Sequence, residues 1–73
     1  MKTTRVEAVV VALTPEFELA HLEAVNGDTL SIGELTEGVD WRQLQVGQRL
    51  ICEVQGEYAL RVVRAEVLPP APS

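Results

Sequence analysis

Side chains able to do covalent or acid–base chemistry are few in this chain of 73 residues, which has one cysteine and one histidine. Cys52 lies in the segment RLICEV and alternates with Leu50 and Val54, so we expect a buried thiol that packs as a small hydrophobe. A single thiol can neither close a disulfide loop nor supply a cluster of metal ligands. His21 has no carboxylate, serine or cysteine placed to share a mechanism with it. We therefore predict a protein that is not an enzyme.

Acidic residues outnumber basic ones, 11 to 6, and the formal net charge is -5. The carboxylates are scattered over turns and strand exteriors without a paired spacing, so neither general acid–base catalysis nor a divalent-metal site is indicated. The chain also lacks a glycine-rich phosphate loop. These observations predict no catalytic residue, no metal site and no cofactor. The net charge alone does not exclude nucleic acid, because the distribution of the cations matters more than their sum.

Length and hydropathy predict one soluble domain. No apolar run approaches the roughly 20 residues that span a bilayer, and the apolar N-terminal segment contains Glu7 and has no small-residue cleavage site. We expect one domain over residues 1–68, a disordered proline-rich tail over residues 69–73, no membrane association and a cytoplasmic location.

The elements that must position these side chains are short strands, because segments rich in valine, leucine and isoleucine alternate with turn residues. The first predicted strand, Arg5–Leu13, is apolar on both faces, so we expect it to be long and bent. Proline lacks the N–H that a ladder needs, so Thr14-Pro15 ends this strand. The other predicted strands are Phe17–Val25, a third one after the next turn, Arg49–Val54, and Tyr58–Leu68 with a bulge at Val62-Val63.

A three-residue loop, Asn26–Asp28, is expected between the second and third strands, because asparagine and glycine tolerate positive φ. It would pair Leu22 with Ile32 and Ala24 with Leu30. The core face then consists of Ala20, Leu22, Ala24, Leu30 and Ile32. The solvent face consists of Leu19, His21, Glu23, Val25, Thr29 and Ser31, with Phe17 also outward unless a bulge near Glu18 turns it in.

The segment from Gly33 to Gln48 breaks the alternation and predicts a loop that holds one short helical turn. Trp41 and Leu44 lie three residues apart in it and would plug one end of a barrel. The fourth strand would then direct Leu50, Cys52 and Val54 inward.

The segment VGQRLICEVQGEYALRVVRAEVL, Val46 to Leu68, resembles the end of the cold-shock domain, where a Gly-Gln pair opens the fourth strand and a glycine-bearing turn leads to the fifth. The resemblance extends more loosely back to Arg5 and implies a five-stranded OB-type Greek-key barrel, with a long loop between the third and fourth strands. An oxyanion-binding Mop-type barrel is the nearest competing family.

Cold-shock domains hold single strands on aromatic rings of the second and third strands, and each stacked ring contributes roughly 1 to 3 kcal/mol. On the resemblance, Leu19 and His21 stand at the two phenylalanine positions, so only Phe17 and His21 offer a ring for stacking. Arg49, Arg61 and Arg64 could gather into one basic strip on the outward faces of neighbouring strands, or could belong to a solvated barrel surface with local ion pairs. The candidate binding residues are Phe17, Leu19, His21, Arg49 and Arg61.

Two functional hypotheses follow. The first is a non-enzymatic, cold-shock-like module that binds single-stranded RNA or DNA weakly and in a salt-sensitive way. The second is a protein-interaction module, either a homodimer or a binder of a basic protein partner, on a barrel that has lost nucleic-acid binding. A Mop-like ligand site or a purely structural role is the remaining alternative.

Overall fold

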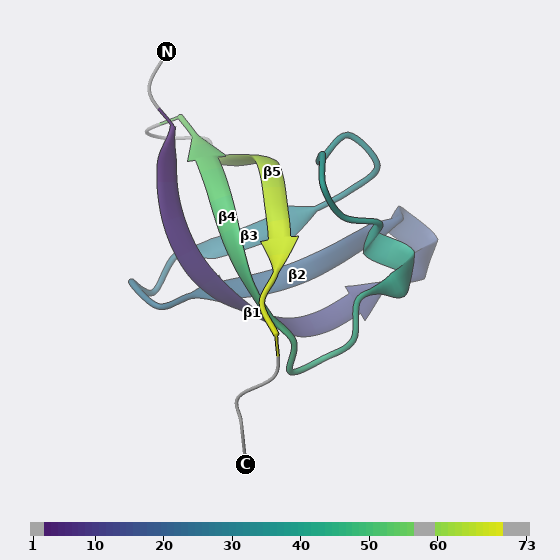
Figure 1. Cartoon of the computed structure of the whole chain (residues 1–73). Helices are drawn as coiled ribbons and strands as arrows, with labels where there is room; N and C mark the ends of the chain where they lie inside the picture. Colours follow the sequence, from purple (N-terminus) through teal and green to yellow (C-terminus); the bar gives the residue numbers. More distant parts are fainter. Residues whose placement is uncertain (1–2, 57–59, 70–73) are drawn as a thin grey trace.

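The computed structural model describes residues 3–56 and 60–69, and within them the chain forms five β-strands and two short 3-10 helices (Figure 1). The elements are β1 (Thr4–Thr14), η1 (Pro15–Phe17), β2 (Leu19–Ala24), β3 (Thr29–Ile32), η2 (Trp41–Gln43), β4 (Arg49–Gln55) and β5 (Arg61–Val67). The prediction of an all-β protein with a single helical turn in the long loop is confirmed, with η1 as an additional turn. Among the described residues, no helix has the length and apolar character that crossing a membrane requires.

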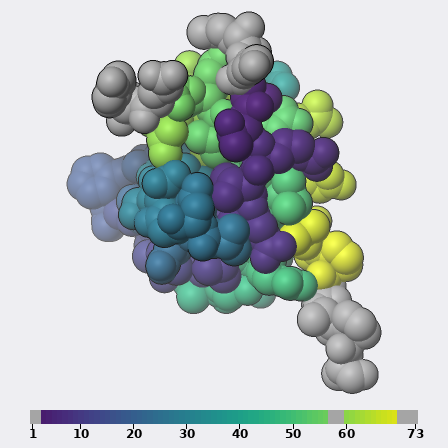
Figure 2. Space-filling model, turned by 90° about the vertical axis from the view of Figure 1, so that its left-hand side faces the viewer, coloured from purple at the N-terminus to yellow at the C-terminus, as the bar shows by residue number. Residues whose placement is uncertain are grey.

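All neighbouring strands are antiparallel, in the order β3-β2-β1-β4-β5, and the sheet is strongly curled (Figure 1). β1 is the central strand. Its first half pairs with β4 and its second half with β2, and Ala8 pairs with both Ala24 and Leu50. Figure 2 shows the same arrangement from another side, with the start of β1 (purple) between the blue β2–β3 hairpin and the green β4. The expectation of a long first strand that serves two parts of the sheet is confirmed.

A bulge lets β1 bend between these two halves. The register with β2 shifts between Val10 and Ala12, so Val11 has no partner on that strand. Beyond the bulge, Thr14 ends the strand, as the sequence predicts. Pro15 then begins η1, which was not predicted. The curl that follows brings β3 and β5, the two ends of the sheet, against each other.

The seam between these two ends is closed by the segment that follows β3. Glu37 forms a parallel bridge with Arg64 of β5. The Glu37 N–H donates to the carbonyl oxygen of Val63 (3.1 Å), and its carbonyl oxygen accepts from the Ala65 N–H (2.9 Å). The seam is therefore joined by backbone hydrogen bonds after β3 has ended.

The core lies inside the curl and follows the alternation of each strand. Its buried side chains are Ala8, Val10, Ala20, Leu22, Ala24, Leu30, Ile32, Trp41, Leu44, Leu50, Cys52, Val54, Val62 and Ala65. All the side chains predicted to face inward from the second, third and fourth strands are among them. Trp41 and Leu44, which the loop pattern places inside the protein, are both buried in this core.

The predicted register of the β2–β3 hairpin is wrong by two residues. Leu22 pairs with Leu30, not with Ile32, and Ile32 pairs with Ala20. A shift of two residues leaves every side chain on its predicted face, because successive side chains of a strand alternate. The core face was therefore predicted correctly from an incorrect pairing.

The loop of this hairpin begins one residue earlier than predicted and comprises Val25, Asn26 and Gly27. The Gly27 N–H donates to the carbonyl oxygen of Ala24 (2.9 Å), and Gly27 has a φ of 94°. The Ala24 N–H donates to the carbonyl oxygen of Asp28 (2.8 Å) and closes the loop. The third loop position therefore has a left-handed backbone, which favours glycine there.

Two strand starts also differ from the predictions. β2 begins at Leu19, not Phe17, because η1 and the left-handed backbone of Glu18 (φ 56°) precede it. β5 begins at Arg61 in the described chain, and the predicted residues Tyr58 and Glu57 lie outside the described residues, as does the tail after Pro69.

The predicted bulge at Val62-Val63 is confirmed. Glu53 of β4 pairs with Arg64, whereas the next residue, Val54, pairs with Val62. Val63 is therefore left out of the β4–β5 register, and its carbonyl oxygen accepts the Glu37 N–H of the seam instead. The bulge thus supplies the acceptor that joins the two ends of the sheet.

Gly38 is the position where we expect the seam to be most sensitive to substitution. Its φ is 88°, and an added Cβ would overlap the carbonyl oxygen of Ala65, which belongs to the seam. We expect Gly38→Ala to lower the free energy of unfolding by about 3 kcal/mol, combining backbone strain with steric overlap. Gly47→Ala is the matched control, because Gly47 has a φ of 96° with nothing within 4 Å of its Cβ position. Gly47→Ala should lower the free energy of unfolding by only about 1 kcal/mol, measured by chemical denaturation. Equal losses of stability in the two variants would contradict the role given to Gly38.

Candidate functional site

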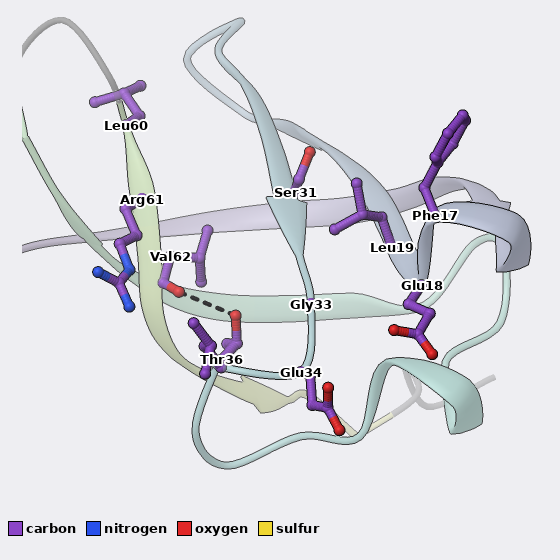
Figure 3. Close-up of a pocket in the computed structure, with 11 residues that line it drawn as sticks. Phe17, Glu18, Leu19, Ser31, Gly33, Glu34, Thr36, Leu60, Arg61 and Val62 are labelled. Atoms are coloured by element: carbon purple, nitrogen blue, oxygen red, sulfur yellow. Dashed lines mark hydrogen bonds between the residues drawn. The ribbon is translucent and has the colours of Figure 1, made fainter.

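A groove of about 350 Å³ runs over the open part of the seam (Figure 3). We call it the seam groove. It is lined by Phe17, Glu18, Leu19, Ser31, Gly33, Glu34, Leu35, Thr36, Leu60, Arg61 and Val62. These residues come from three places that are far apart in the sequence: the turn before β2, the end of β3 with its following loop, and the start of β5.

The wall formed by Phe17 depends on the turn between β1 and β2. Pro15 occupies the first turn of η1, and the Glu18 N–H donates to its carbonyl oxygen (3.1 Å). This turn holds Phe17 outside the strand, where its side chain is 72% exposed and stands at the rim of the groove (Figure 3). The left-handed backbone of Glu18, which is not a glycine, costs roughly 1 to 2 kcal/mol of stability. Other interactions of the fold must offset this cost to keep the turn that exposes Phe17.

The opposite wall and the end of the groove are also apolar. Leu35 is 78% exposed, Leu60 is 37% exposed, and Leu19 is half-buried between the two walls. At Gly33 a Cβ would lie 3.1 Å from Cδ2 of Leu19, so the absence of a side chain there leaves room for the leucine. The groove therefore gathers four large apolar side chains with access to solvent, a concentration that marks interaction surfaces on soluble proteins.

The seam is fastened at one end of the groove. The hydroxyl of Thr36 is buried and donates to the carbonyl oxygen of Val62 (3.0 Å; dashed line in Figure 3). Immediately beyond it lies the bridge between Glu37 and Arg64. The groove is consequently bounded at Thr36 and open alongside β3.

The charges around the groove are mainly negative. Glu18 and Glu34 lie along one side, and Arg61 lies on the other (Figure 3). An acidic balance at the groove agrees with the net charge of -5 for the chain. This distribution attracts cationic groups and repels phosphate.

The structure brings three of the predicted site residues together and separates two. Phe17, Leu19 and Arg61 all line the seam groove. His21 and Arg49 do not. Leu35, Leu60 and Glu34 were not predicted, because they belong to loops or loop ends whose positions in space do not follow from strand alternation.

His21 lies on the outer face of β2, as predicted, but it is engaged within the sheet. Its Nε2 is 2.7 Å from the hydroxyl oxygen of Thr14. It is flanked by Ala12 of β1 and Ser31 of β3, and it is half-buried. Its imidazole is thus held by a neighbouring strand, whereas Phe17 projects freely.

Of the two alternatives for the arginines, the structure does not support a basic strip that joins Arg49 to Arg61. Arg49 begins β4, whereas Arg61 pairs with Gln55 at the other end of that strand. Six residues of strand separate these positions, a distance of roughly 20 Å. Arg49 lies instead beside β1, with its guanidinium 3.8 Å from the carboxylate of Glu7. The antiparallel pairing of β4 and β5 is what places the two arginines apart.

Side chains suited to covalent or metal chemistry are not gathered at the groove. Cys52 is fully buried in the core, and this burial raises the pKa of its thiol to about 11. Within residues 3–56 and 60–69, no three histidine, cysteine or acidic side chains are grouped so that they could hold a metal ion. What the groove offers is apolar contact and negative charge.

Comparison of the chain with protein-family models, with curated proteins and with solved structures gives no match. The function of the groove must therefore be argued from its own residues.

The buried thiol makes a measurable contribution to alkaline stability. An exposed thiol would ionise near pH 9, but the folded one keeps its proton to about pH 11, where its raised pKa lies. Because the unfolded chain releases this proton first, the free energy of unfolding should fall as the pH rises from 9 to 11, by about 2 to 3 kcal/mol. Below pH 9 the thiol adds no pH dependence.

Cys52→Ala should remove this part of the alkaline slope, although it also lowers stability at every pH by leaving a cavity. The measurement is the difference between the unfolding free energies of the two proteins at several pH values, which cancels the titration of other groups. If the unfolding free energies of the two proteins run parallel above pH 9, Cys52 titrates alike in the folded and unfolded chain, and the prediction is wrong.

Proposed function

We propose that this chain is a non-enzymatic protein-interaction module on an OB-type Greek-key barrel, and that the seam groove docks a partner segment carrying apolar and cationic side chains. The observation that carries the proposal is the exposure of Phe17 and Leu35 on one groove with Leu19 and Leu60. Apolar groups at this density lose contact with water when a partner covers them, at about 25 cal/mol for each Å².

The strand order supports the OB-type assignment. A central β1 that pairs with both β2 and β4 gives a sheet with β3 and β5 as its ends. The parallel bridge between Glu37 and Arg64 joins these ends, as closure of a small Greek-key barrel requires. The cold-shock likeness of Val46–Leu68 agrees with this assignment.

The charges select the chemistry of the partner. Glu18 and Glu34 flank the apolar surface, and only Arg61 among the groove residues is basic. A partner with lysine or arginine beside its apolar residues is complementary to this pattern. A second copy of the chain is less suitable, because a two-fold contact through the groove would place the same acidic residues against one another, on two molecules of net charge -5.

A second candidate, weak binding of single-stranded RNA or DNA, is favoured by one specific observation: the exposed ring of Phe17 shares the groove with Arg61. One stacked base contributes roughly 1 to 3 kcal/mol, which is too little for tight binding. Trp41 does not add a second ring, because it is buried in the core. We therefore place this candidate after the protein-interaction module.

The docking proposal is tested with a short, capped peptide of alternating valine and lysine, labelled for fluorescence anisotropy. We expect Phe17→Ala and Leu35→Ala each to weaken its binding roughly fivefold or more, because each removes an apolar contact. Val25→Ala is the matched control, since Val25 is 73% exposed, much as Phe17 is, but lies in the β2–β3 turn outside the groove. Equal effects of the three substitutions, or no binding by the unmodified protein, would refute the proposal.

The second candidate is tested with oligothymidine at low salt in the same assay. We expect at most weak binding that disappears as the ionic strength rises. Oligothymidine that binds more tightly than the peptide, and loses affinity in both Phe17→Ala and Arg61→Gln, would reverse the order of the two candidates.

A further inference from the structure

We infer that the partner segment binds as an additional β-strand along the outer edge of β3, with apolar and basic residues in alternation. This inference rests on the proposed docking function and specifies how the groove is occupied. β3 is an end strand of the sheet and pairs only with β2 in the described chain.

The hydrogen-bonding phase of the hairpin shows which backbone groups of β3 face outward. The Ala24 N–H donates to the carbonyl oxygen of Asp28, and the Ala24 carbonyl oxygen accepts from Gly27, so the backbone groups of Ala24 face β3 at a bonded position of the ladder. In an antiparallel ladder bonded pairs alternate with non-bonded ones, so Leu30 and Ile32 are bonded to β2, whereas Thr29 and Ser31 are not. The N–H and C=O groups of Thr29 and Ser31 therefore point to the outer edge.

These edge groups have no backbone partner among the described residues. The seam closes only after β3, where Thr36 and Glu37 bond to β5. Both Thr29 and Ser31 are exposed, and Ser31 lines the seam groove between Leu19 and Leu60. A strand laid about 4.8 Å from β3 would enter the groove and pair with these edge groups by strand addition, and the start of β5, which now lies against β3, would move outward to admit it.

The faces of such a strand explain the expected alternation in the partner. One set of its side chains would continue the inner face of Leu30 and Ile32, towards Leu60 and Val62, and should be apolar. The other set would continue the solvent-exposed face of Thr29 and Ser31. Glu23, which pairs with Thr29 on β2, adds negative charge to that face, so basic residues suit it.

Amide hydrogen exchange tests the inference directly. In the protein alone, we expect the amides of Thr29 and Ser31 to exchange rapidly and those of Leu30 and Ile32 slowly, because only the latter are bonded to β2. Saturation with the alternating valine–lysine peptide should slow Thr29 and Ser31 at least tenfold and leave the other two unchanged. A peptide of the same composition with its valines and lysines in two blocks is the matched probe, and it should bind more weakly.

A pair of substitutions separates backbone pairing from side-chain contact. Ser31→Pro removes the outward N–H and leaves the β2–β3 ladder intact, since proline is tolerated on an edge strand whose N–H faces solvent. It should weaken peptide binding roughly five- to tenfold. Ser31→Ala keeps the N–H and should therefore weaken peptide binding much less than Ser31→Pro does. Exchange at Leu30 and Ile32 reports whether the Ser31→Pro variant retains the ladder.

The outcomes distinguish this inference from the proposal on which it rests. Peptide binding that is sensitive to Phe17→Ala but leaves Thr29 and Ser31 unprotected would overturn strand addition and keep the docking function. Slow exchange of both amides before peptide is added would show that the edge is already occupied and would also overturn it. If the alternating and block peptides bind with equal affinity, charge attraction accounts for the binding, and strand addition is overturned too. Absence of binding at the groove would remove both proposals.

Discussion

Hydrogen bonding of β1 along both of its edges is the constraint on which the rest of the structure depends. One strand of eleven residues serves β4 with its first half and β2 with its second half, and the bulge at Val11 lets it turn between them. This bend curls the sheet and brings β3 and β5 together. Both the enclosed core and the seam are consequences of this arrangement.

The curl is completed by hydrogen bonds only where Thr36 and Glu37 reach β5. Next to that closure, the edge of β3 and the start of β5 are separated by a groove with apolar walls. A chain of 73 residues buries only about 60% of the surface that its unfolded form exposes. Keeping Phe17 and Leu35 outside the core of so small a protein forgoes stabilisation, and this is physically reasonable where a partner covers them.

Strand alternation was enough to predict the faces of the sheet, but not its pairing or its groove. Because the β2–β3 register differs by an even number of residues, Leu22 and Leu30 face the core in both the predicted and the observed pairing. The prediction of Phe17 within a strand was wrong, because the left-handed Glu18 separates the turn from β2. Leu35 and Leu60 were missed for another reason: only the curl of the whole sheet places these two loop residues on one surface.

The candidate basic strip shows that strand alternation also does not predict which charged side chains lie together. Arg49 and Arg61 both begin strands, and the sequence alone does not indicate that antiparallel pairing puts these starts at opposite ends. Once the strands are placed, carboxylates outnumber basic groups near Phe17, and for this reason we propose a cationic, apolar partner rather than phosphate.

An amide chemical-shift map of the isotopically labelled protein during titration with the alternating valine–lysine peptide tests the central claim most directly. The account predicts that Leu19, Leu35 and Arg61 shift together along one binding curve, because the curl places all three on one groove, and that Arg49 does not respond. Shifts centred on Arg49 and the start of β4, or a map in which the three groove residues respond independently, would contradict it.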